Sequence, residues 1–382
     1  MGRAISAHAP DIALFLPSLD GGGAERVFVQ LANEFAALGL RVHLVLAAAR
    51  GPYLDEVSAS VRLVDLNARG VLRSLPKLVR YLRSERPPVI LSALDHSNVV
   101  AILACFLAGS GTRCVISMRS VPSAVYREER SARKWILPMA MRRSYRRAHR
   151  IIANSQAAAS DLIENFRVRA EQVSVIYNPL DLESIERLSR ETVENRWLSL
   201  NSAPLILGVG SLAILKDFPT LIRAFSIVRS ERECRLAILG EGPDRRDLEG
   251  LVAELGLQKD VYLPGFVNNP FAWMRAAEVV VGASLTEGCP NALMQALACG
   301  AAVVSTDCVG GCSEILEGGR WGRLVPIKDA QAMAAAILAT MERTGVVDTR
   351  RRAADFAIGG IARTYLRQLM PDFAFPVAER KS

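Results

Sequence analysis

Short apolar runs alternate with amphipathic stretches from one end of this sequence to the other. The runs have the length and β-branched content of strands, and most of the stretches between them have helical periodicity. Parallel strands need long connections, usually helices, so the alternation predicts α/β layers built on parallel sheets. The predicted strands span residues 11–16, 42–47, 61–65, 89–93, 114–118, 150–153 and 173–176, then 205–209, 236–239, 261–263, 279–281, 302–305 and 323–325.

The domain organisation follows from length and from this alternation. The 382 residues exceed what one hydrophobic core usually serves, which predicts two domains. The first alternation fills residues 1–180, and a polar segment with a short predicted helix, which we expect to be a linker, follows at 181–202. The second alternation fills residues 203–354, and residues 355–382 hold a final helix and a tail. Each alternation is typical of a doubly wound, Rossmann-like domain.

The composition is that of a globular protein, with 50% apolar and 23% charged residues. The longest apolar stretch, 99–108, has about half of the roughly 20 residues that span a membrane, so it predicts a buried helix. Residues 1–10 show no secretory signal, and we expect a cytoplasmic protein or one peripheral to the inner face of the cell membrane. The seven cysteines form no disulfide framework, and Cys308 and Cys312 lack the second ligand pair of a zinc site.

Positive charge is concentrated in segment 127–150, which has nine Lys or Arg against two Glu in a chain of net charge +8. Nucleic acid, an anionic membrane surface or a polyanionic substrate could bind such a segment. No nucleic-acid motif accompanies it, so no nucleic acid is expected as a partner. Apolar residues such as Trp135 and Ile136 lie among the cations, which is typical of a helix at a membrane interface. A solvated charged face is the alternative.

A glycine-rich loop, 19–26, follows the first predicted strand. Gly22 and Gly23 would let the backbone approach an anionic group, with a helix N-terminus behind it. A dinucleotide-binding loop would have its third glycine where this chain has Arg26, and the second strand ends without the ribose-binding acid. NAD binding is therefore disfavoured. A tight turn that needs glycine only for its conformation is the alternative.

Glycine and polar residues also follow strands in the second half. Gly210 and Ser211 end one strand and lead to Lys216, which places a positive charge where a diphosphate could bind. The next two strands end in Gly-Glu-Gly-Pro, with Gly242, and in Pro-Gly-Phe-Val, with Val267. Because ligands of open parallel sheets bind at the carboxyl ends of strands, these loops are candidates for a ligand site.

The most specific motif spans residues 284–300 and follows the strand 279–281. It opens a helix near Pro290, which places Glu287 and the free amides near Asn291 at a helix N-terminus. Gln295 follows about one turn further along and can face the same ligand. So many polar and glycine residues beside a buried strand predict a polar ligand.

The order of these motifs resembles that of the family 4 glycosyltransferases. It runs Gly-Gly-Gly-Ala-Glu-Arg, Gly-x5-Lys, Gly-Glu-Gly-Pro, Pro-Gly-Phe, Glu-Gly-x-Pro-Asn, Ala-Cys-Gly and Val-Val-Ser-Thr-Asp, and it is densest in the second half. The resemblance implies the GT-B architecture, an α/β fold in which two Rossmann-like domains face each other across a deep interdomain cleft. It further implies that domain 1–180 binds the acceptor and that domain 203–354 binds the nucleotide sugar.

The resemblance also implies a reaction. A hexose or N-acetylhexosamine would pass with retention from a nucleotide-diphosphate donor, here a UDP-sugar, to a hydroxyl of a glycan or polyprenyl-linked acceptor in polysaccharide, lipopolysaccharide or glycolipid biosynthesis. No metal or other cofactor is implied, because a basic pair and helix amides meet the charge of the leaving diphosphate. Ser211 replaces one member of that pair, and Gln295 replaces the second of the family's two glutamates. A non-catalytic homologue that binds nucleotide sugars is therefore the alternative, whereas a glycoside hydrolase would need a second acid beside Glu287.

The family's roles carry over to matching positions of this chain. Lys216 would bind the diphosphate, Glu287 a sugar hydroxyl and Gln295 the ribose. In the first half, His96 and Arg119 follow strands, and both are candidates for the acceptor site. His96 could act on the acceptor hydroxyl or bind phosphate, and a helix-capping histidine is the alternative. The predicted catalytic residues are Glu287, Lys216 and His96, and the predicted donor-binding residues are Gly22, Gly23, Gly210, Ser211, Lys216, Gly242, Val267, Glu287, Gly288, Asn291, Ala292 and Gln295.

Overall fold

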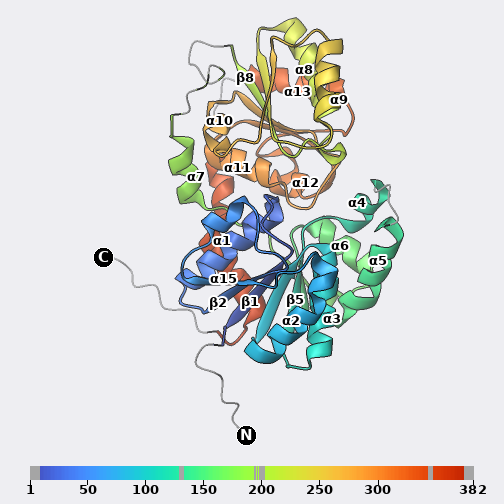
Figure 1. Cartoon of the computed structure of the whole chain (residues 1–382). Coiled ribbons are helices and arrows are strands. Elements are labelled where there is room, and N and C mark those ends of the chain that lie inside the picture. The colour runs from blue at the N-terminus through green and yellow to red at the C-terminus, as the bar shows by residue number, and fades with distance from the viewer. Residues whose placement is uncertain are drawn as a thin grey trace. The chain divides into compact units, whose positions relative to one another are not determined.

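The computed structural model describes residues 9–128, 133–192, 195, 197, 203–342 and 347–373 of the chain. The chain forms two compact units, of which the first combines Met1–Pro179 with Ile358–Ser382 and the second comprises Leu180–Ala357. The last helix of the sequence therefore belongs to the first unit. Figure 1 shows the elements of each unit.

Unit 1 is built on a seven-stranded sheet with the strand order β3-β2-β1-β4-β5-β6-β7. Every neighbouring pair in it is parallel. The order reverses direction at β1, so β1 and β4 form the switch point of a doubly wound sheet. The strands are β1 Ile12–Leu16, β2 Val42–Leu46, β3 Val61–Asp65, β4 Val89–Ala93, β5 Arg113–Met118, β6 Arg150–Ala153 and β7 Val173–Val175.

Strand β1 shows why these segments are apolar at every position. Its five residues are all buried. Ile12, Leu14 and Leu16 point into the core on one face of the sheet, whereas Ala13 and Phe15 point into the core on the other. A strand covered by helices on both faces has no solvent-facing position, so its sequence shows no polar alternation.

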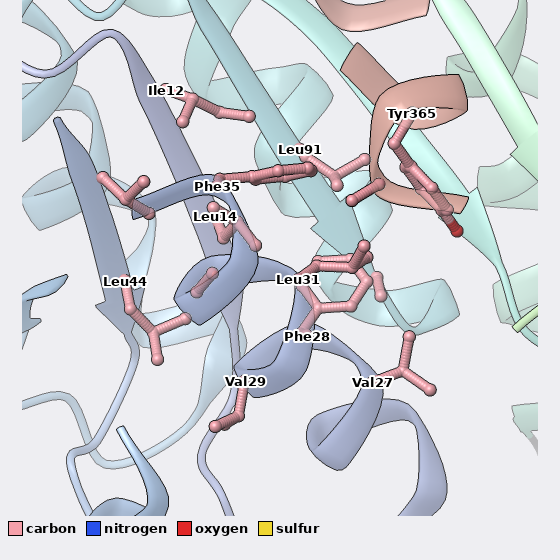
Figure 2. Close-up of a cluster of buried hydrophobic side chains, with 14 of the residues drawn as sticks. Ile12, Leu14, Val27, Phe28, Val29, Leu31, Phe35, Leu44, Leu91 and Tyr365 are labelled. Atoms are coloured by element: carbon pink, nitrogen blue, oxygen red, sulfur yellow. The ribbon is translucent and has the colours of Figure 1, made fainter. Parts of the chain in front are cut away.

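Helices cover both faces of this sheet. On one face, α1 (Gly23–Ala37) packs beside α15 (Ile358–Leu369), and Phe28, Phe35 and Tyr365 fill the core between them and the strands (Figure 2). On the other face the buried side chains come mainly from α2 (Val71–Glu85), α3 (Asp95–Ala108), α5 (Arg133–Ser144) and α6 (Gln156–Glu164). The shorter elements are η1 Pro52–Glu56, α4 Pro122–Glu128, η2 Tyr145–Arg147 and η3 Ala170–Gln172.

Unit 2 is built on a six-stranded parallel sheet with the order β10-β9-β8-β11-β13-β15. Helices α8 (Phe218–Glu231), α9 (Arg245–Glu254) and α13 (Ala330–Met341) share one core with its strands. Helices α10 (Pro270–Ala276) and α11 (Asn291–Cys299) also contact the sheet, and α7 (Leu182–Ser189) packs against both of these helices. The strands are β8 Leu205–Val209, β9 Arg235–Leu239, β10 Val261–Gly265, β11 Val279–Gly282, β13 Val303–Thr306 and β15 Arg323–Val325.

The sequence-based fold is confirmed as two parallel-sheet, Rossmann-like domains. Each predicted strand is a strand, with ends that shift by one or two residues. The prediction of a buried helix at 99–108 is half wrong: the segment is helical, but Leu103, Phe106 and Leu107 are exposed. The reason is that only one side of α3 packs against the sheet and α2. Among the helices of the described residues, none has the length and apolar content to cross a membrane.

Candidate active site

The loops that carry the second-half motifs come together because their strands are neighbours. Strands β8, β11 and β13 lie side by side in parallel, so their carboxyl ends share one edge of the sheet. The loop after β8 ends in the short helix η5 (Ile214–Lys216), and the N–H of Leu285 in the loop after β11 donates to the carbonyl of Leu215 at 2.9 Å. This places Lys216 beside the loop that carries Glu287.

Lys216 and Glu287 form an ion pair at this edge, between Nζ and Oε1. Ser284 Oγ donates a second hydrogen bond to the same Oε1, at 2.7 Å. The Lys216 and Glu287 side chains are 27% and 16% exposed, so the pair is sheltered yet open to a ligand. Burial lowers the pKa of Lys216, but the attraction and hydrogen bond of Glu287 outweigh it, and the net pKa lies above its ordinary value. Lys216 is therefore a cation at physiological pH.

The backbone of Glu287 is fixed by the loop that follows β13. Residues Thr286–Glu287 form the short strand β12, which pairs in parallel with β14 (Val309–Gly310). Gly310 has a φ of +139°, and a Cβ there would overlap the Glu287 carbonyl oxygen. The next residue, Gly311, donates its N–H to the Gly288 carbonyl at 3.1 Å. Only glycine allows this close approach, so Gly310 sets the position of Glu287.

A buried threonine holds Ser284 in turn. Thr306 Oγ1, at the end of β13, donates to the Ser284 carbonyl at 2.6 Å, and both residues are buried. The carboxylate of Glu287 is thus positioned by three neighbouring strand ends: Lys216 after β8, Ser284 after β11 and Thr306 on β13. Preorganised groups of this kind suit a site that binds a polar ligand.

Helix α11 begins at Asn291 directly after Pro290, the N-cap residue, whose side chain makes no capping hydrogen bond. The dipole of the helix favours a negatively charged group at this end. Gln295 lies four residues after Asn291, which places both on one face of the helix. Gln295 is half-buried, and within the described part of the chain its side chain makes no hydrogen bond.

The glycine loops after β8 and β9 support this edge. Gly210 is half-buried, and a Cβ there would lie 3.4 Å from the Lys216 side chain. Gly242 packs on the backbone of Leu212, whose N–H donates to the Glu241 carbonyl at 2.9 Å. Gly242 thus has a packing role that the sequence did not predict, in addition to its expected role in donor binding. Ser211 is exposed and Val267, after β10, is half-buried.

A pocket of about 30 Å³ opens beside the ion pair. Lys216, Ser284, Glu287 and Ala292 line it together with apolar residues of β11. A water needs about 10 to 15 Å³ on this measure, so the pocket has room for about two or three waters and is too small to enclose a nucleotide sugar. A larger hollow of about 740 Å³ lies at the opposite edge of the sheet, around Val303 and Arg323, and contains none of the predicted site residues.

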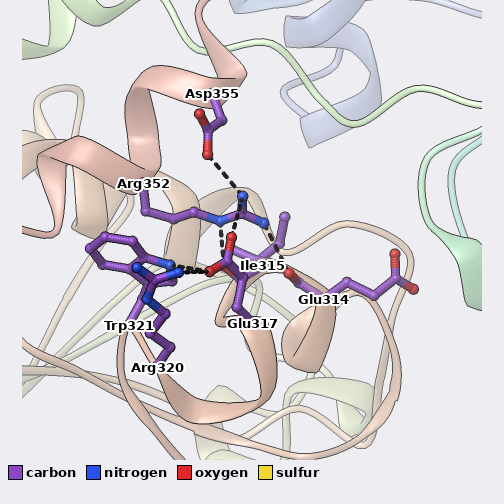
Figure 3. Close-up of polar contacts among 7 residues, drawn as sticks. All are labelled: Glu314, Ile315, Glu317, Arg320, Trp321, Arg352 and Asp355. Carbon is purple, nitrogen blue, oxygen red and sulfur yellow. Dashed lines mark hydrogen bonds and ion pairs between the residues drawn. The ribbon is translucent and has the colours of Figure 1, made fainter.

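Arg352 anchors the segment that follows Gly311. Its Nε and Nη2 donate to the carbonyls of Ile315 and Glu314 at 2.9 and 3.0 Å, at the end of α12 (Cys312–Ile315). Its Nη1 pairs with Glu317 at 3.0 Å and Asp355 at 2.9 Å (Figure 3). The Arg352 side chain is 12% exposed. The contacts tie α14 (Arg350–Ala353) to α12 and so steady the loop that holds Glu287.

The predicted first-half glycines lie at the start of α1, where Gly22 is the N-cap and Gly23 the first helical residue. The Glu25 side chain folds back against Gly22, so that a Cβ there would overlap its carboxylate. Burial raises the pKa of Glu25 above its ordinary value, and Asp20 adds to the rise while Arg119 opposes it. The helix N-terminus is thus partly covered by a carboxylate of the chain itself.

The two acceptor candidates lie at the carboxyl ends of β4 and β5. Arg119 donates to Asn178 Oδ1 at 2.7 Å and to the Tyr365 hydroxyl at 3.3 Å, and its buried Nε has no partner within the described residues. It therefore bonds to neutral groups rather than to a carboxylate. His96 is half-buried in the first turn of α3, where Asp95 accepts a hydrogen bond from Tyr126 at 2.6 Å.

The structure brings Lys216 and Glu287 into contact and places Ala292 and Gln295 on the helix beside them. Gly22, Gly23, His96 and Arg119 lie on the other unit. Sequence reasoning missed Ser284, Thr306 and Gly310. A signal for Ser284 was present in the sequence, because it is a hydroxyl residue three positions before Glu287. A signal for Gly310 was also present, because it begins a Gly-Gly pair soon after the strand that ends at Thr306. Within the described residues, no group of three or more His, Cys, Asp or Glu is arranged to hold a metal ion.

Comparisons with known proteins match both halves of the chain. The family model described as "Glycosyltransferase Family 4" matches residues 21–184, and that described as "Glycosyl transferases group 1" matches residues 203–343. In Campylobacter jejuni, the N-acetylgalactosamine-N,N'-diacetylbacillosaminyl-diphospho-undecaprenol 4-alpha-N-acetylgalactosaminyltransferase is 31% identical over 336 residues, 84% of this chain and 87% of that protein. The lipopolysaccharide core biosynthesis glycosyltransferase LpsE of Rhizobium meliloti is 23% identical over 83% of this chain and 84% of its own length.

Solved structures share the fold. HepE of Anabaena, solved in complex with UDP, has a TM-score of 0.76 at 21% identity and covers 94% of this chain and 100% of its own. Sucrose-phosphate synthase of Thermosynechococcus elongatus has a TM-score of 0.78 at 22% identity, with 95% and 99% covered. The fold is thus that of the GT-B glycosyltransferases. Together with the family models and the Campylobacter relative, it shows that this chain belongs to glycosyltransferase family 4.

Proposed function

We propose that this glycosyltransferase moves a hexose or N-acetylhexosamine from a UDP-sugar, with retention, to a hydroxyl of a glycan or polyprenyl-linked acceptor. The reaction would serve cell-surface polysaccharide or glycolipid biosynthesis, in the cytoplasm or at the inner face of the membrane. The observation that carries the proposal is the contact of Lys216 with Glu287 beside the N-terminus of α11. This contact combines a cation that can bind a diphosphate with a carboxylate that can accept hydrogen bonds from sugar hydroxyls.

The names of similar proteins support the donor and acceptor classes. The Campylobacter relative acts, by its name, on a diphospho-undecaprenol acceptor, and LpsE is named for lipopolysaccharide core biosynthesis. HepE has been solved with UDP and with UDP-glucose. We infer the same chemical classes for this chain, because it carries Lys216 and Glu287 at the matching motif positions.

The proposed chemistry uses electrostatic stabilisation. Lys216 meets the negative charge that develops as the diphosphate leaves, and the amides near Asn291 add to it. Glu287 accepts hydrogen bonds from donor hydroxyls and so positions the reacting carbon. Gln295 accepts a hydrogen bond from the ribose. No metal has a part in this proposal.

A second candidate function is nucleotide-sugar binding without turnover. It is favoured by Ser211 and Gln295, two neutral residues where the family's pattern has charged ones. A hydrogen bond to a charged group contributes about 1.5 to 3 kcal/mol and a neutral one about 0.5 to 1.5, so each replacement costs roughly 1 kcal/mol of donor binding. Each replacement weakens donor affinity about 5-fold and the two together about 30-fold, which leaves catalysis open.

Two measurements on the purified protein test the function. Thermal shifts with UDP, GDP and ADP and with their sugars should show stabilisation by UDP and one or more UDP-sugars. Slow hydrolysis of the stabilising donor should then release UDP. Stabilisation by none of these ligands contradicts the proposal. Stabilisation without any release, in the presence or absence of lipid-linked acceptors, favours the binding homologue.

A further inference from the structure

Helix α3 turns three large apolar side chains to solvent. Leu103, Phe106 and Leu107 are 40%, 69% and 46% exposed. Their spacing of three and four residues places them on one face of the helix. The opposite face carries Val100, Ala101 and Ala104, which are buried in the core of unit 1. The exposed face of α3 is therefore apolar, although it does not pack into the core of unit 1.

Helix α5 has the same property. Trp135, Ile136 and Met139 are 72%, 65% and 54% exposed, and their spacing again gives one outward face. Six of the thirteen exposed large hydrophobic side chains of the described residues lie on these two helices. Single exposed apolar residues are ordinary, but a cluster marks an interaction site.

The two outward faces belong to neighbouring, linked helices. Helix α3 contacts both α5 and the turn η2 that follows it, and Figure 1 shows α3 and α5 adjacent in unit 1. The guanidinium of Arg147, in η2, lies 5.6 Å from the centroid of the Phe106 ring. We call this the α3–α5 surface. It comprises Leu103, Phe106, Leu107, Trp135, Ile136, Met139, Arg142, Arg143, Arg146 and Arg147.

The charge of this surface is of one sign. All four of its arginines are exposed, and Arg143 and Arg146 form no ion pair within the described residues. The sequence has no Asp or Glu in 96–108 or in 130–150. Apolar side chains with arginines beside them and no acids complement a surface with negative headgroups and an apolar interior.

We propose that the α3–α5 surface docks this protein on an anionic lipid bilayer, with α3 and α5 lying at the interface. Exposed aliphatic side chains such as Ile136 and Leu103 cannot stack on nucleic-acid bases as aromatic side chains do, which disfavours nucleic acid as the partner. A second copy of the chain would oppose two sets of arginines across a symmetric interface, which repulsion disfavours. Residues 135–147 thus supply only part of the contact, and α3, far from them in sequence, supplies the rest.

Vesicle co-sedimentation tests the proposal without any donor or acceptor. Vesicles of phosphatidylcholine with phosphatidylglycerol should bind the full chain, pure phosphatidylcholine should bind it far less, and added salt should weaken binding. Arg143→Gln with Arg146→Gln should reduce the binding constant by about 25-fold, at about 5-fold for each cation. Phe106→Ser with Ile136→Ser should reduce it at least about 10-fold, through lost apolar burial. Leu72→Ser is the matched control, because Leu72 is 75% exposed on α2, outside the surface.

Tryptophan fluorescence gives a second readout that does not depend on a folded double variant. Addition of anionic vesicles should shift the emission to the blue, and Trp135→Phe should abolish the shift. Equal binding to both vesicle types overturns the proposal, as does a Leu72→Ser effect equal to that of Phe106→Ser with Ile136→Ser. A concentration-dependent dimer that these variants abolish, with no vesicle binding, would assign the surface to a second copy of the chain instead.

Discussion

Lys216 and Glu287, 71 residues apart in the sequence, form an ion pair at the carboxyl edge of the second sheet, and Ser284 donates to the same carboxylate oxygen. The cation that the proposed function assigns to the diphosphate is thus already paired within the chain. The diphosphate of a donor must therefore replace Glu287 as the ion-pair partner of Lys216. Ser284 then remains to hold the carboxylate, whose Oε2 accepts no hydrogen bond from the described residues.

The first prediction concerns pH. Glu287 keeps the pKa of Lys216 above its ordinary 10.5, so in the wild type the ammonium stays charged through mildly alkaline solution. In Glu287→Gln, burial still lowers the pKa of Lys216 and only the smaller attraction of Cys312 and Cys308 opposes it, so Lys216 loses its proton at lower pH. UDP affinity of the variant should stay within about 3-fold of wild type at neutral pH while turnover falls about 100-fold. The variant-to-wild-type affinity ratio should then fall as pH rises toward about 10. A ratio that does not change with pH would contradict this assignment.

Ser284 is predicted to act through Glu287. Ser284→Ala should lower kcat about 10-fold with little change in UDP affinity, because it removes one hydrogen bond to a charged group. Ser284→Thr retains a hydroxyl and should recover much of the rate. In a Glu287→Gln background, Ser284→Ala should lower kcat far less, because the hydrogen bond to the Glu287 carboxylate is already lost. Additive effects in this double-mutant cycle would show that Ser284 has only a local structural role.

Gln295 is predicted to face the ribose, because its amide is half-buried, free of partners in the described structure and one turn inside α11. Gln295→Glu should keep UDP affinity or improve it several-fold, since a charged acceptor forms the stronger hydrogen bond. Isothermal titration with UDP measures this. A folded Gln295→Glu variant with weaker UDP binding would remove Gln295 from the ribose site.

Arg352 is predicted to stabilise unit 2 rather than to take part in transfer. Arg352→Ala should lower the unfolding free energy by about 2 kcal/mol or more, because two hydrogen bonds from a charged group to backbone carbonyls are lost. Trp321, which donates to Glu317 in the same cluster, provides a fluorescence probe for urea unfolding. Exposed Arg351→Ala is the control and should change little. Equal unfolding curves for the two variants would contradict the role given to Arg352.

Much of the fold could be predicted because the strands are buried on both faces and therefore stand out as apolar runs, as in β1. The placement of Lys216 and Glu287 at one edge followed from the rule that parallel strands align their carboxyl ends. Their direct contact did not follow, because it depends on side-chain conformations and on the backbone approach at Gly310.

Other features depend on which surface a helix presents. The sequence of α3 is apolar over 99–108, which gives no sign of which residues face solvent. The apolar face of α15 is evident in sequence, but not that it packs beside α1 in unit 1. Such choices are made by tertiary packing, and periodicity alone does not resolve them.

The most direct test of the proposed donor site is UDP release from a UDP-sugar by wild type and Lys216→Ala, measured together with UDP affinity. Exposed Lys259→Ala, in the same unit, is the matched control. Lys216→Ala should lower turnover about 100-fold or more, on the scale of one lost charge contact in the transition state, and should weaken UDP binding, whereas the control should do neither. A folded Lys216→Ala variant with wild-type turnover would contradict the assignment of Lys216 to the donor site.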